Sequence, residues 1–388
     1  MPYFSFSIKQ NFQLNIENLS NFDEIKPDIT YYSKNTFLWK FLNKNQKNLN
    51  FINFETRQHL NNNFNKKNIL FCLPPSIGMG DAIEYGLAIS AIYSSKNSQD
   101  FAIAFTGRYK LIFEKYFSFK KIYKHIISQK ELKKYDSVFH LSLEIKKLKN
   151  QKYLRSDIED SITDYFNVEK KAFKESRELK KIKIRTMNLF PISTSPIRSM
   201  PIFLINKIID NFQSEFNINI ILDRSSQISN YIENLISAKN YNKIYPNSLE
   251  ELNHVIEKTE FGIFIDSGPL HLAKILSIKG VLITTSVGGD ILLNRFNSIK
   301  EIKNNFSSKF CKAPCGLTNL INYDNKIGCY NSLEITSKDI LQKENFNSLQ
   351  RGDIKNKYID FIIKPVGCIK NINIDIVIKN IKDYINNL

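Results

Sequence analysis

The chain has 388 residues, of which 42% are hydrophobic, and it carries 55 Lys and Arg residues against 38 Asp and Glu, a formal net charge of +17. The length predicts two or three globular domains, and the composition excludes a largely disordered chain. No apolar run approaches the roughly 18 residues of a membrane-spanning helix, so we expect no transmembrane segment.

Strand-like and helix-like segments alternate from about residue 68 onward. A first series predicts strands at 68–73, 101–106 and 135–143 and a helix at 81–95. A second series predicts strands at 182–190, 218–223, 261–265 and 280–286, with helices at 201–212, at 248–259 and after residue 267. Such alternation predicts the α/β class, with parallel sheets covered by helices on both faces.

Two series predict two such domains, and the charged stretch 169–181 is a plausible linker. Residues 1–66 are rich in Asn and show little periodicity, so we interpret them as an N-terminal extension. We expect an N-terminal domain over 67–178 and a C-terminal domain over 179–345. The last segment, 346–388, is expected to be helical and could pack back on the N-terminal domain.

The positive charge favours anionic partners, namely nucleic acid, an acidic membrane surface or phosphate-bearing small molecules. The lysines are scattered, however, and the chain has no arginine-rich run and no strip of alternating basic and aromatic residues. A general bias toward Lys and Asn explains the charge equally well. We therefore expect no nucleic-acid partner and keep nucleic-acid binding only as a minor hypothesis.

The odd number of cysteines, five, argues against a disulfide framework and for a reducing compartment. The N-terminal sequence MPYFSFSIKQNF lacks the charged and apolar regions of a signal peptide. We therefore expect a cytoplasmic protein. Peripheral contact with a membrane is compatible with this location.

The first loop that could carry chemistry is LPPSIGMGDAIEYG, residues 73–86, between a predicted strand and a predicted helix. In open α/β sheets, ligands bind at the carboxyl ends of the strands. Gly78 and Gly80 allow close approach of the backbone, and Asp81 stands at the start of the helix. The alternative is that Asp81 only caps the helix, where its negative charge is favoured.

The second loop lies in FGIFIDSGPLHLAKIL, residues 261–276. Gly268 permits a tight turn, Pro269 suits the first helical turn, and the start of the helix offers free N–H groups to an anion. His271 follows in the first turn. Asp266 would repel a phosphate, so it is expected to bind sugar hydroxyls or N–H groups of the loop. The alternative is that Asp266 and Ser267 cap the helix and His271 fills space.

The third loop is PISTSPIRSMP, residues 191–201, which follows a strand and leads into a helix. The hydroxyls of Ser193, Thr194 and Ser195 can bind an anion. Arg198 can bind a phosphate through two parallel N–H donors. An ordinary polar loop with a solvated arginine explains the pattern equally well.

In this order, the loops resemble the ADP-heptose:lipopolysaccharide heptosyltransferase family, glycosyltransferase family 9. GMGDAIEYGLAISAI is similar to the family's N-terminal Gly-Asp motif, and DSGPLHLA (266–273) is similar to its donor motif. RSMP (198–201) and the cysteine-bearing stretch 311–340 resemble further family segments, so the resemblance covers about 68–340. Ser267, Leu270 and Met200 stand where the family usually has Thr, Met and Trp.

The resemblance implies the GT-B architecture, in which two Rossmann-like domains with parallel sheets face each other across a cleft. It also implies an inverting, metal-independent glycosyltransferase with no cofactor, in which Asp81 is the general base and Gly78 and Gly80 form the loop on the acceptor side. The implied donor-binding residues are Ser193, Thr194, Arg198, Asp266, Ser267, Gly268 and His271.

The implied donor is a nucleotide-diphosphate sugar similar to ADP-heptose, and the acceptor is a cell-surface glycan or a lipid-linked saccharide. The alternative is a non-catalytic relative that binds a sugar nucleotide or a glycan.

Two other groups of residues could contact a metal or a substrate. Cys311, Cys315 and Cys329 have a loose metal-ligand spacing, but a fourth ligand is missing nearby, so we expect reduced thiols and no metal. His140 ends a predicted strand on the acceptor side, where either substrate contact or a structural role is expected.

Overall fold

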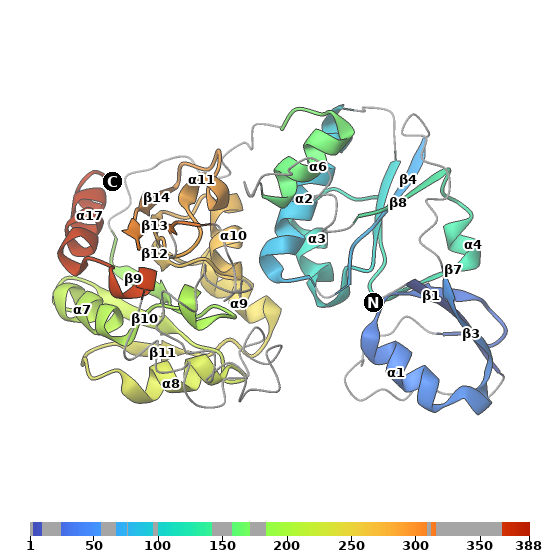
Figure 1. Cartoon of the computed structure of the whole chain (residues 1–388), viewed down its shortest axis with the longest axis horizontal. Coiled ribbons are helices and arrows are strands. Elements are labelled where there is room, and N and C mark those ends of the chain that lie inside the picture. Colours follow the sequence, from blue (N-terminus) through green and yellow to red (C-terminus); the bar gives the residue numbers. More distant parts are fainter. Residues whose placement is uncertain are drawn as a thin grey trace. The chain divides into compact units, whose positions relative to one another are not determined.

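The computed structural model describes residues 3–9, 25–55, 67–75, 77–95, 100–141, 157–170, 184–308, 312–315 and 367–388. The chain divides into two compact units, residues 1–171 and 172–388 (Figure 1). The predicted boundary at 178/179 falls within 171–183, outside the described residues, so the domain limits stay a prediction.

The second unit is built on one six-stranded sheet in which every neighbouring pair is parallel. The strands are β9 (Thr186–Phe190), β10 (Asn217–Ile221), β11 (Asn242–Ile244), β12 (Phe261–Phe264), β13 (Gly280–Ile283) and β14 (Ile299–Ile302). Their order in the sheet is β11-β10-β9-β12-β13-β14, so the direction of progression reverses between β9 and β12. This is the strand order of a Rossmann sheet.

Helices cover both faces of this sheet, as the alternation of segments predicts. They are α7 (Ile202–Phe212), α8 (Gln227–Leu235), α9 (Leu249–Glu257), α10 (Gly268–Ile275), α11 (Gly289–Leu292), α16 (Gly367–Lys370) and α17 (Ile374–Asn386). Figure 1 shows α7 and α17 on one face and α9 and α10 on the other; α17 packs on α7, and α9 packs on α10. The hydroxyl of Ser248 caps α9 by accepting from the N–H of Glu251 at 3.1 Å, which is half of a capping box.

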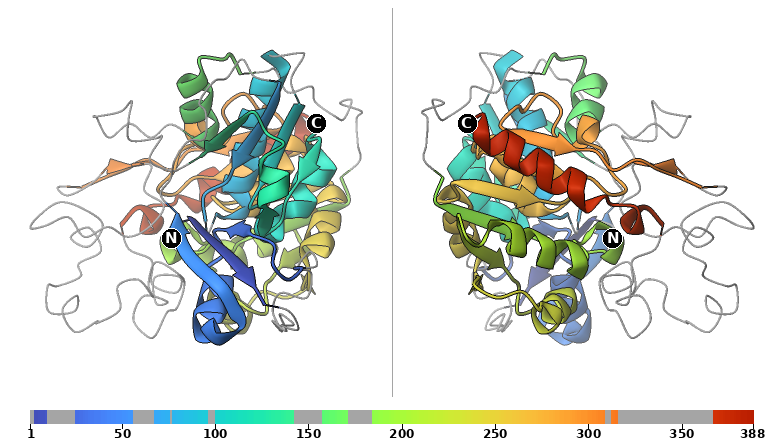
Figure 2. Two further views of the ribbon diagram at one scale, coloured as in Figure 1. Left: turned by 90° about the vertical axis from the view of Figure 1, so that its right-hand side faces the viewer. Right: turned by 90° about the vertical axis from the view of Figure 1, so that its left-hand side faces the viewer.

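The last helix of the chain, α17, packs on α7 and β14 of the second unit (Figure 2). Val377, Ile378 and Ile381 form an apolar stripe at helical spacing and are buried in the core of this unit. The hydroxyl of Tyr384 donates to the carbonyl of Ser298 at 2.9 Å. The sequence interpretation allowed this segment to pack on the N-terminal domain, whereas its apolar face is covered by the second unit.

The first unit also contains a parallel sheet, in the order β6-β5-β4-β8. Its strands are β4 (Asn68–Cys72), β5 (Asp100–Ala104), β6 (Lys121–Ile122) and β8 (Ser137–His140). Its helices are α2 (Met79–Ser95), η2 (Gly107–Tyr109), α3 (Lys110–Tyr116), α4 (Gln129–Leu132) and α6 (Ile158–Phe166). Here the progression reverses between β4 and β8, so β4 occupies the position that β9 has in the second unit.

The N-terminal residues form a folded sheet rather than a plain extension. All pairs in its order β3-β1-β2-β7 are antiparallel. The elements are β1 (Tyr3–Ile8), β2 (Tyr31–Ser33), α1 (Thr36–Lys44), η1 (Gln46–Asn48), β3 (Leu49–Glu55) and β7 (Ile126–Ser128). The helix α1 buries Leu38 and Leu42 in a core shared with Phe4 and Phe6.

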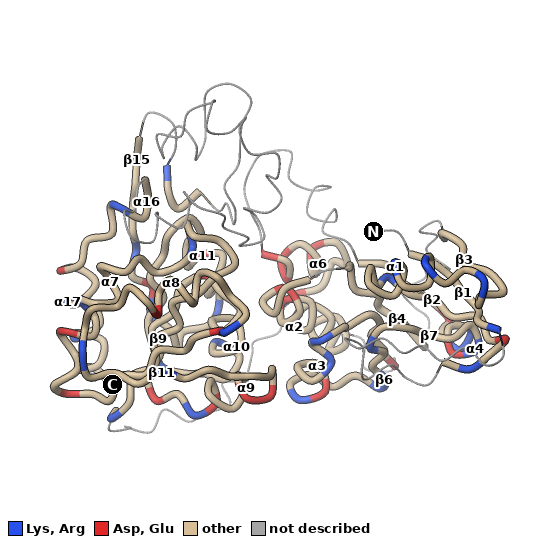
Figure 3. Tube along the Cα trace, turned by 90° about the horizontal axis from the view of Figure 1, so that it is seen from below, with Lys and Arg blue, Asp and Glu red and all other residues tan. Residues whose placement is uncertain are grey.

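The charged residues are distributed along both units, with Lys and Arg interspersed among Asp and Glu (Figure 3). None of the helices that the structure describes combines the length and apolar character needed to cross a membrane.

Candidate functional site

The loop that carries Asp81 leaves the carboxyl end of β4, at the reversal point of the first sheet. Asp81 is the third residue of α2, after Gly80, and is half-buried. Its Oδ2 accepts a hydrogen bond from the N–H of Gly78 at 2.8 Å. The carboxylate therefore closes its own loop, as the capping interpretation requires, but no donor among the described residues reaches Oδ1.

Two buried tyrosines lie within electrostatic range of Asp81. Burial is the main cause that raises the pKa of Tyr85 above its usual range, and the charge of Asp81 adds to it. Burial likewise raises the pKa of Tyr109. The charge of Arg108 and its hydrogen bond to Tyr109 oppose this rise, and the charge of Asp81 adds to it. The charge of Asp81 therefore acts on two buried tyrosine hydroxyls.

In the second unit, the loops after β9 and β12 meet at the reversal point of the six-stranded sheet. The hydroxyl of Ser193 donates to the carbonyl of Asp266 at 2.9 Å. The guanidinium of Arg198 donates to the same carbonyl at 3.3 Å and to the hydroxyl of Thr194 at 2.7 Å. These contacts bring together four residues that the sequence predicts for one site.

An ion pair joins Arg198 to Asp266, with 3.1 Å between Nη1 and Oδ2. The two side chains are only 12% and 6% exposed. The Nε–H of Arg198 is buried and has no hydrogen-bond partner among the described residues. The sequence did not predict that Asp266 pairs with Arg198, and its expected contact with sugar hydroxyls stays a prediction.

The start of α10 lacks a side-chain cap. Ser267 occupies the N-cap position, but its hydroxyl donates to the carbonyl of Ile265 at 3.3 Å and makes no cap hydrogen bond. Gly268 and Pro269 begin the helix, and His271 lies half-buried in its first turn. The free N–H groups of this helix start can therefore bind an anion, in line with the functional interpretation of the loop.

Thr285 is a candidate that the sequence analysis did not find. It lies two residues after β13, the neighbour of β12 in the sheet. The residue is 1% exposed, and its hydroxyl has no hydrogen-bond partner among the described residues. The signal available in the sequence was its position, because a hydroxyl residue just past a buried strand lies at the ligand-binding edge of a parallel sheet.

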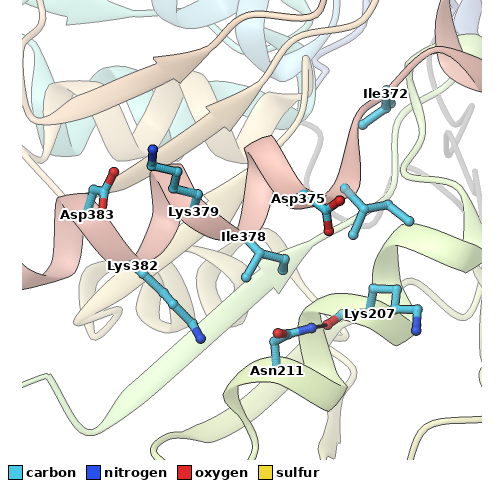
Figure 4. A pocket seen from close by; sticks show the side chains of 9 residues that line it. Lys207, Asn211, Ile372, Asp375, Ile378, Lys379, Lys382 and Asp383 are labelled. Atoms are coloured by element: carbon cyan, nitrogen blue, oxygen red, sulfur yellow. Dashed lines mark hydrogen bonds between the residues drawn. The ribbon is translucent and has the colours of Figure 1, made fainter.

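A groove of about 610 Å³ lies elsewhere in the second unit, between α7 and α17 (Figure 4). Lys207 and Asn211 of α7 and Ile378 and Lys382 of α17 are among its lining residues. No lining residue belongs to the loops after β9 and β12. The groove is therefore not part of the predicted donor site.

The expected cysteine region, 311–340, falls almost entirely outside the described residues. Cys311 and Cys329 are among those left out, and Cys315 is half-buried. Within the described part of the chain, no three His, Cys, Asp or Glu residues are arranged to hold a metal ion. His140 is buried at the end of β8, and its ring contacts that of Tyr3 edge-on at 5.1 Å, which favours the structural interpretation.

No family model and no curated protein matches the chain. Among solved structures, it resembles a glycosyl transferase family 9 protein from Veillonella parvula at 9% identity, with a TM-score of 0.51, over 85% of this chain and 100% of that one. Lower TM-scores relate it to two E. coli proteins. Heptosyltransferase WaaC with ADP has a TM-score of 0.43 at 9% identity, over 61% of this chain and 93% of that one. The iron-containing dodecameric glycosyltransferase TibC has a TM-score of 0.46 at 11% identity, over 94% of this chain and 90% of that one. The likeness to the Veillonella protein confirms the predicted fold class: the chain has the fold of a family 9 glycosyl transferase, built from two Rossmann-like α/β domains.

Proposed function

We propose that the protein is an inverting glycosyltransferase that moves a sugar from a nucleotide-diphosphate sugar to a hydroxyl of a glycan or lipid-linked saccharide. One observation carries this proposal. Each of the two sequence motifs, that of Asp81 and that of residues 266–273, follows the strand at which the order of its Rossmann sheet reverses. This is where sheets of this kind bind their ligands.

In the proposed reaction, the Oδ1 atom of Asp81 removes the proton from the acceptor hydroxyl. The acceptor oxygen forms a bond to the anomeric carbon of the donor while the bond from that carbon to the diphosphate oxygen breaks. The leaving diphosphate keeps the electron pair, and the configuration at the anomeric carbon inverts. The Gly78 N–H supports this role because it fixes Oδ2 and so orients the other oxygen of the carboxylate.

On the donor side, negative charge grows on the leaving diphosphate, so the site needs donors that are already oriented toward it. The uncapped start of α10 and the free Nε–H of Arg198 fit this need. The Asp266 carboxylate is neutralised by its ion pair with Arg198, which reduces its repulsion of a phosphate. We extend the proposed donor site to the hydroxyl of Thr285.

The donor is proposed to be similar to ADP-heptose, and the chemistry needs neither a metal nor a cofactor. We place the reaction in the cytoplasm, with peripheral membrane contact where the acceptor is lipid-linked. The resemblance of residues 266–273 to the donor motif of the heptosyltransferases supports the choice of donor.

The Asp81→Asn variant tests the proposal, because Asn keeps an oxygen for the Gly78 N–H and removes the base. The assay measures nucleotide release from a panel of ADP-, UDP- and GDP-sugars, with water as the acceptor. The wild-type protein is expected to turn over at least one donor, and Asp81→Asn to reduce that rate about 10²–10⁴-fold.

Nucleotide binding by Asp81→Asn, followed by thermal shift, should equal that of the wild type, because the donor loops belong to the other unit. Undiminished turnover in the variant would reject Asp81 as the base. Binding of a sugar nucleotide by the wild type without any turnover would favour the non-catalytic alternative.

A further inference from the structure

Lys34 is a buried lysine that the proposed reaction does not use. It follows β2 of the N-terminal sheet and is only 4% exposed. Its Nζ donates to the carbonyl of Leu73 at 3.1 Å, and it lies 5.6 Å from the centre of the Phe105 ring. A charged ammonium is expensive to remove from water, so a buried lysine needs partners that compensate for the lost hydration.

The contacts of Lys34 place it at the ligand-binding edge of the first Rossmann sheet. Leu73 directly follows β4, and Phe105 directly follows β5. Burial raises the pKa of Cys72, the last residue of β4, to about 12, and the charge of Lys34 opposes this rise. The ammonium of Lys34 therefore lies close enough to the end of β4 to interact electrostatically with Cys72. The ammonium therefore lies where β4 turns into the Asp81 loop.

The neighbours of Lys34 tie the same segment to a third strand. The hydroxyl of Ser33 donates to the carbonyl of His125 at 2.8 Å, and the side-chain amide of Asn35 lies 3.0 Å from Nδ1 of the same histidine. His125 follows β6. Residues 33–35 thus contact the chain beyond β4, β5 and β6, which makes the N-terminal sheet part of this edge.

The chain that leads from Leu73 toward Asp81 begins with two conformationally restricted residues. Leu73 is followed by Pro74 and Pro75, whose rings fix φ at both positions. Gly78 then donates its N–H to Asp81. The hydrogen bond from Lys34 to the carbonyl of Leu73 therefore restricts the positions that the Asp81 carboxylate can adopt. Misplacement of a catalytic group by about 1 Å can lower the rate of an enzyme about 100-fold.

We infer that Lys34 is a positioning residue for Asp81, through which the N-terminal sheet fixes the loop that carries the base. This inference rests on the proposed function, since it assigns a task at the same site. It gives residues 1–66 a role in transfer, which the sequence left open.

The test compares Lys34→Met, which keeps the apolar stem, with Lys34→Arg, which restores a donor. Lys9→Met is the matched control, because Lys9 also donates to a backbone carbonyl, that of Lys47 at 2.9 Å, but is exposed. Nucleotide release from a donor sugar is measured well below the unfolding temperature. We expect about a 10–100-fold lower kcat in Lys34→Met, an unchanged KM for the donor, partial recovery in Lys34→Arg and no change in Lys9→Met.

Hydrogen exchange supplies a readout that does not need turnover. The amides of residues 77–81 should exchange faster in Lys34→Met and at the wild-type rate in Lys9→Met. Unchanged exchange, or a kcat equal to that of the wild type, would overturn the inference. A wild-type protein without turnover on any donor would instead reject the proposed function, and the exchange rates would still decide whether Lys34 holds the loop.

Discussion

The pair of Arg198 and Asp266 has a structural and a binding task at once. It joins the loops after β9 and β12, and it neutralises a carboxylate beside the helix start that we propose for the diphosphate. A buried ion pair contributes little compared with well-packed apolar residues, but removal of one partner leaves an uncompensated charge. The pair therefore makes each residue depend on the other.

This dependence predicts non-additive effects on stability. Arg198→Met and Asp266→Asn should each lower the free energy of unfolding of the second unit by about 3–5 kcal/mol, because each leaves the other residue buried without its charged partner. The double variant should lose clearly less than the sum of the two. Urea denaturation of the three variants measures this, and additive losses would show that the two side chains do not interact.

At the scale of elements, the sequence predicted seven of the ten strands described in the two parallel sheets and missed β6, β11 and β14. The runs at 68–73 and 261–265 became β4 and β12, because short apolar runs between turn residues are typical of strands buried on both faces. The motifs of Asp81 and of residues 266–273 were found for the same reason, since each lies within one strand–turn–helix segment.

Some of the elements that the sequence did not reveal depend on partners far along the chain. β2 has three residues, and its partner β7 also has three. Such short strands carry too few residues for a periodic pattern, and only their pairing defines them. Lys34 and Thr285 were missed in the same way, because their roles come from neighbours in the fold and not from a local motif.

The short helix α4 shows how one side chain links elements of the first unit. Hydrogen bonds from Lys121, Lys134 and Tyr123 lower the pKa of Glu131 from 4.5 to about 2. Lys121 belongs to β6, so Glu131 ties α4 to the edge of the parallel sheet.

This lowered pKa predicts an acid-sensitive contribution to stability. Because the folded pKa of Glu131 lies below the unfolded value, its contribution is complete above about pH 5 and is lost as the pH falls from about 4.5 toward 2. The side chain is 22% exposed, so we expect about 1–3 kcal/mol after solvent screening. Glu131→Gln should be less stable than the wild type by this amount at pH 7 and equally stable near pH 2, as measured by urea denaturation. A difference that persists at pH 2 would contradict this assignment.

At the scale of the whole molecule, each unit has its own parallel sheet with its own apolar core. The proposed donor residues all belong to the second unit, and the proposed base belongs to the first. Ligand binding and proton removal can therefore be studied separately in one chain.

This division predicts that calorimetry resolves two unfolding transitions. ADP, or the nucleotide that binds best, should raise the transition temperature of the second unit only. At a concentration 100 times its Kd, the free energy of unfolding of that unit should increase by about 2.7 kcal/mol. Arg198→Met should weaken this shift, and Asp81→Asn should not. A nucleotide that stabilises only the first unit would contradict the proposed donor site.

The pairing of β2 with β7 also affects how the protein is made. The register joins Ser33 to Ile126, so the ribosome must add 93 further residues after Ser33 before the partner strand exists. At an elongation rate of about 5–20 residues per second, this takes roughly 5–20 s. During that interval the nascent β2 keeps an open edge, and a chaperone or a neighbouring nascent chain can reach it before β7 does.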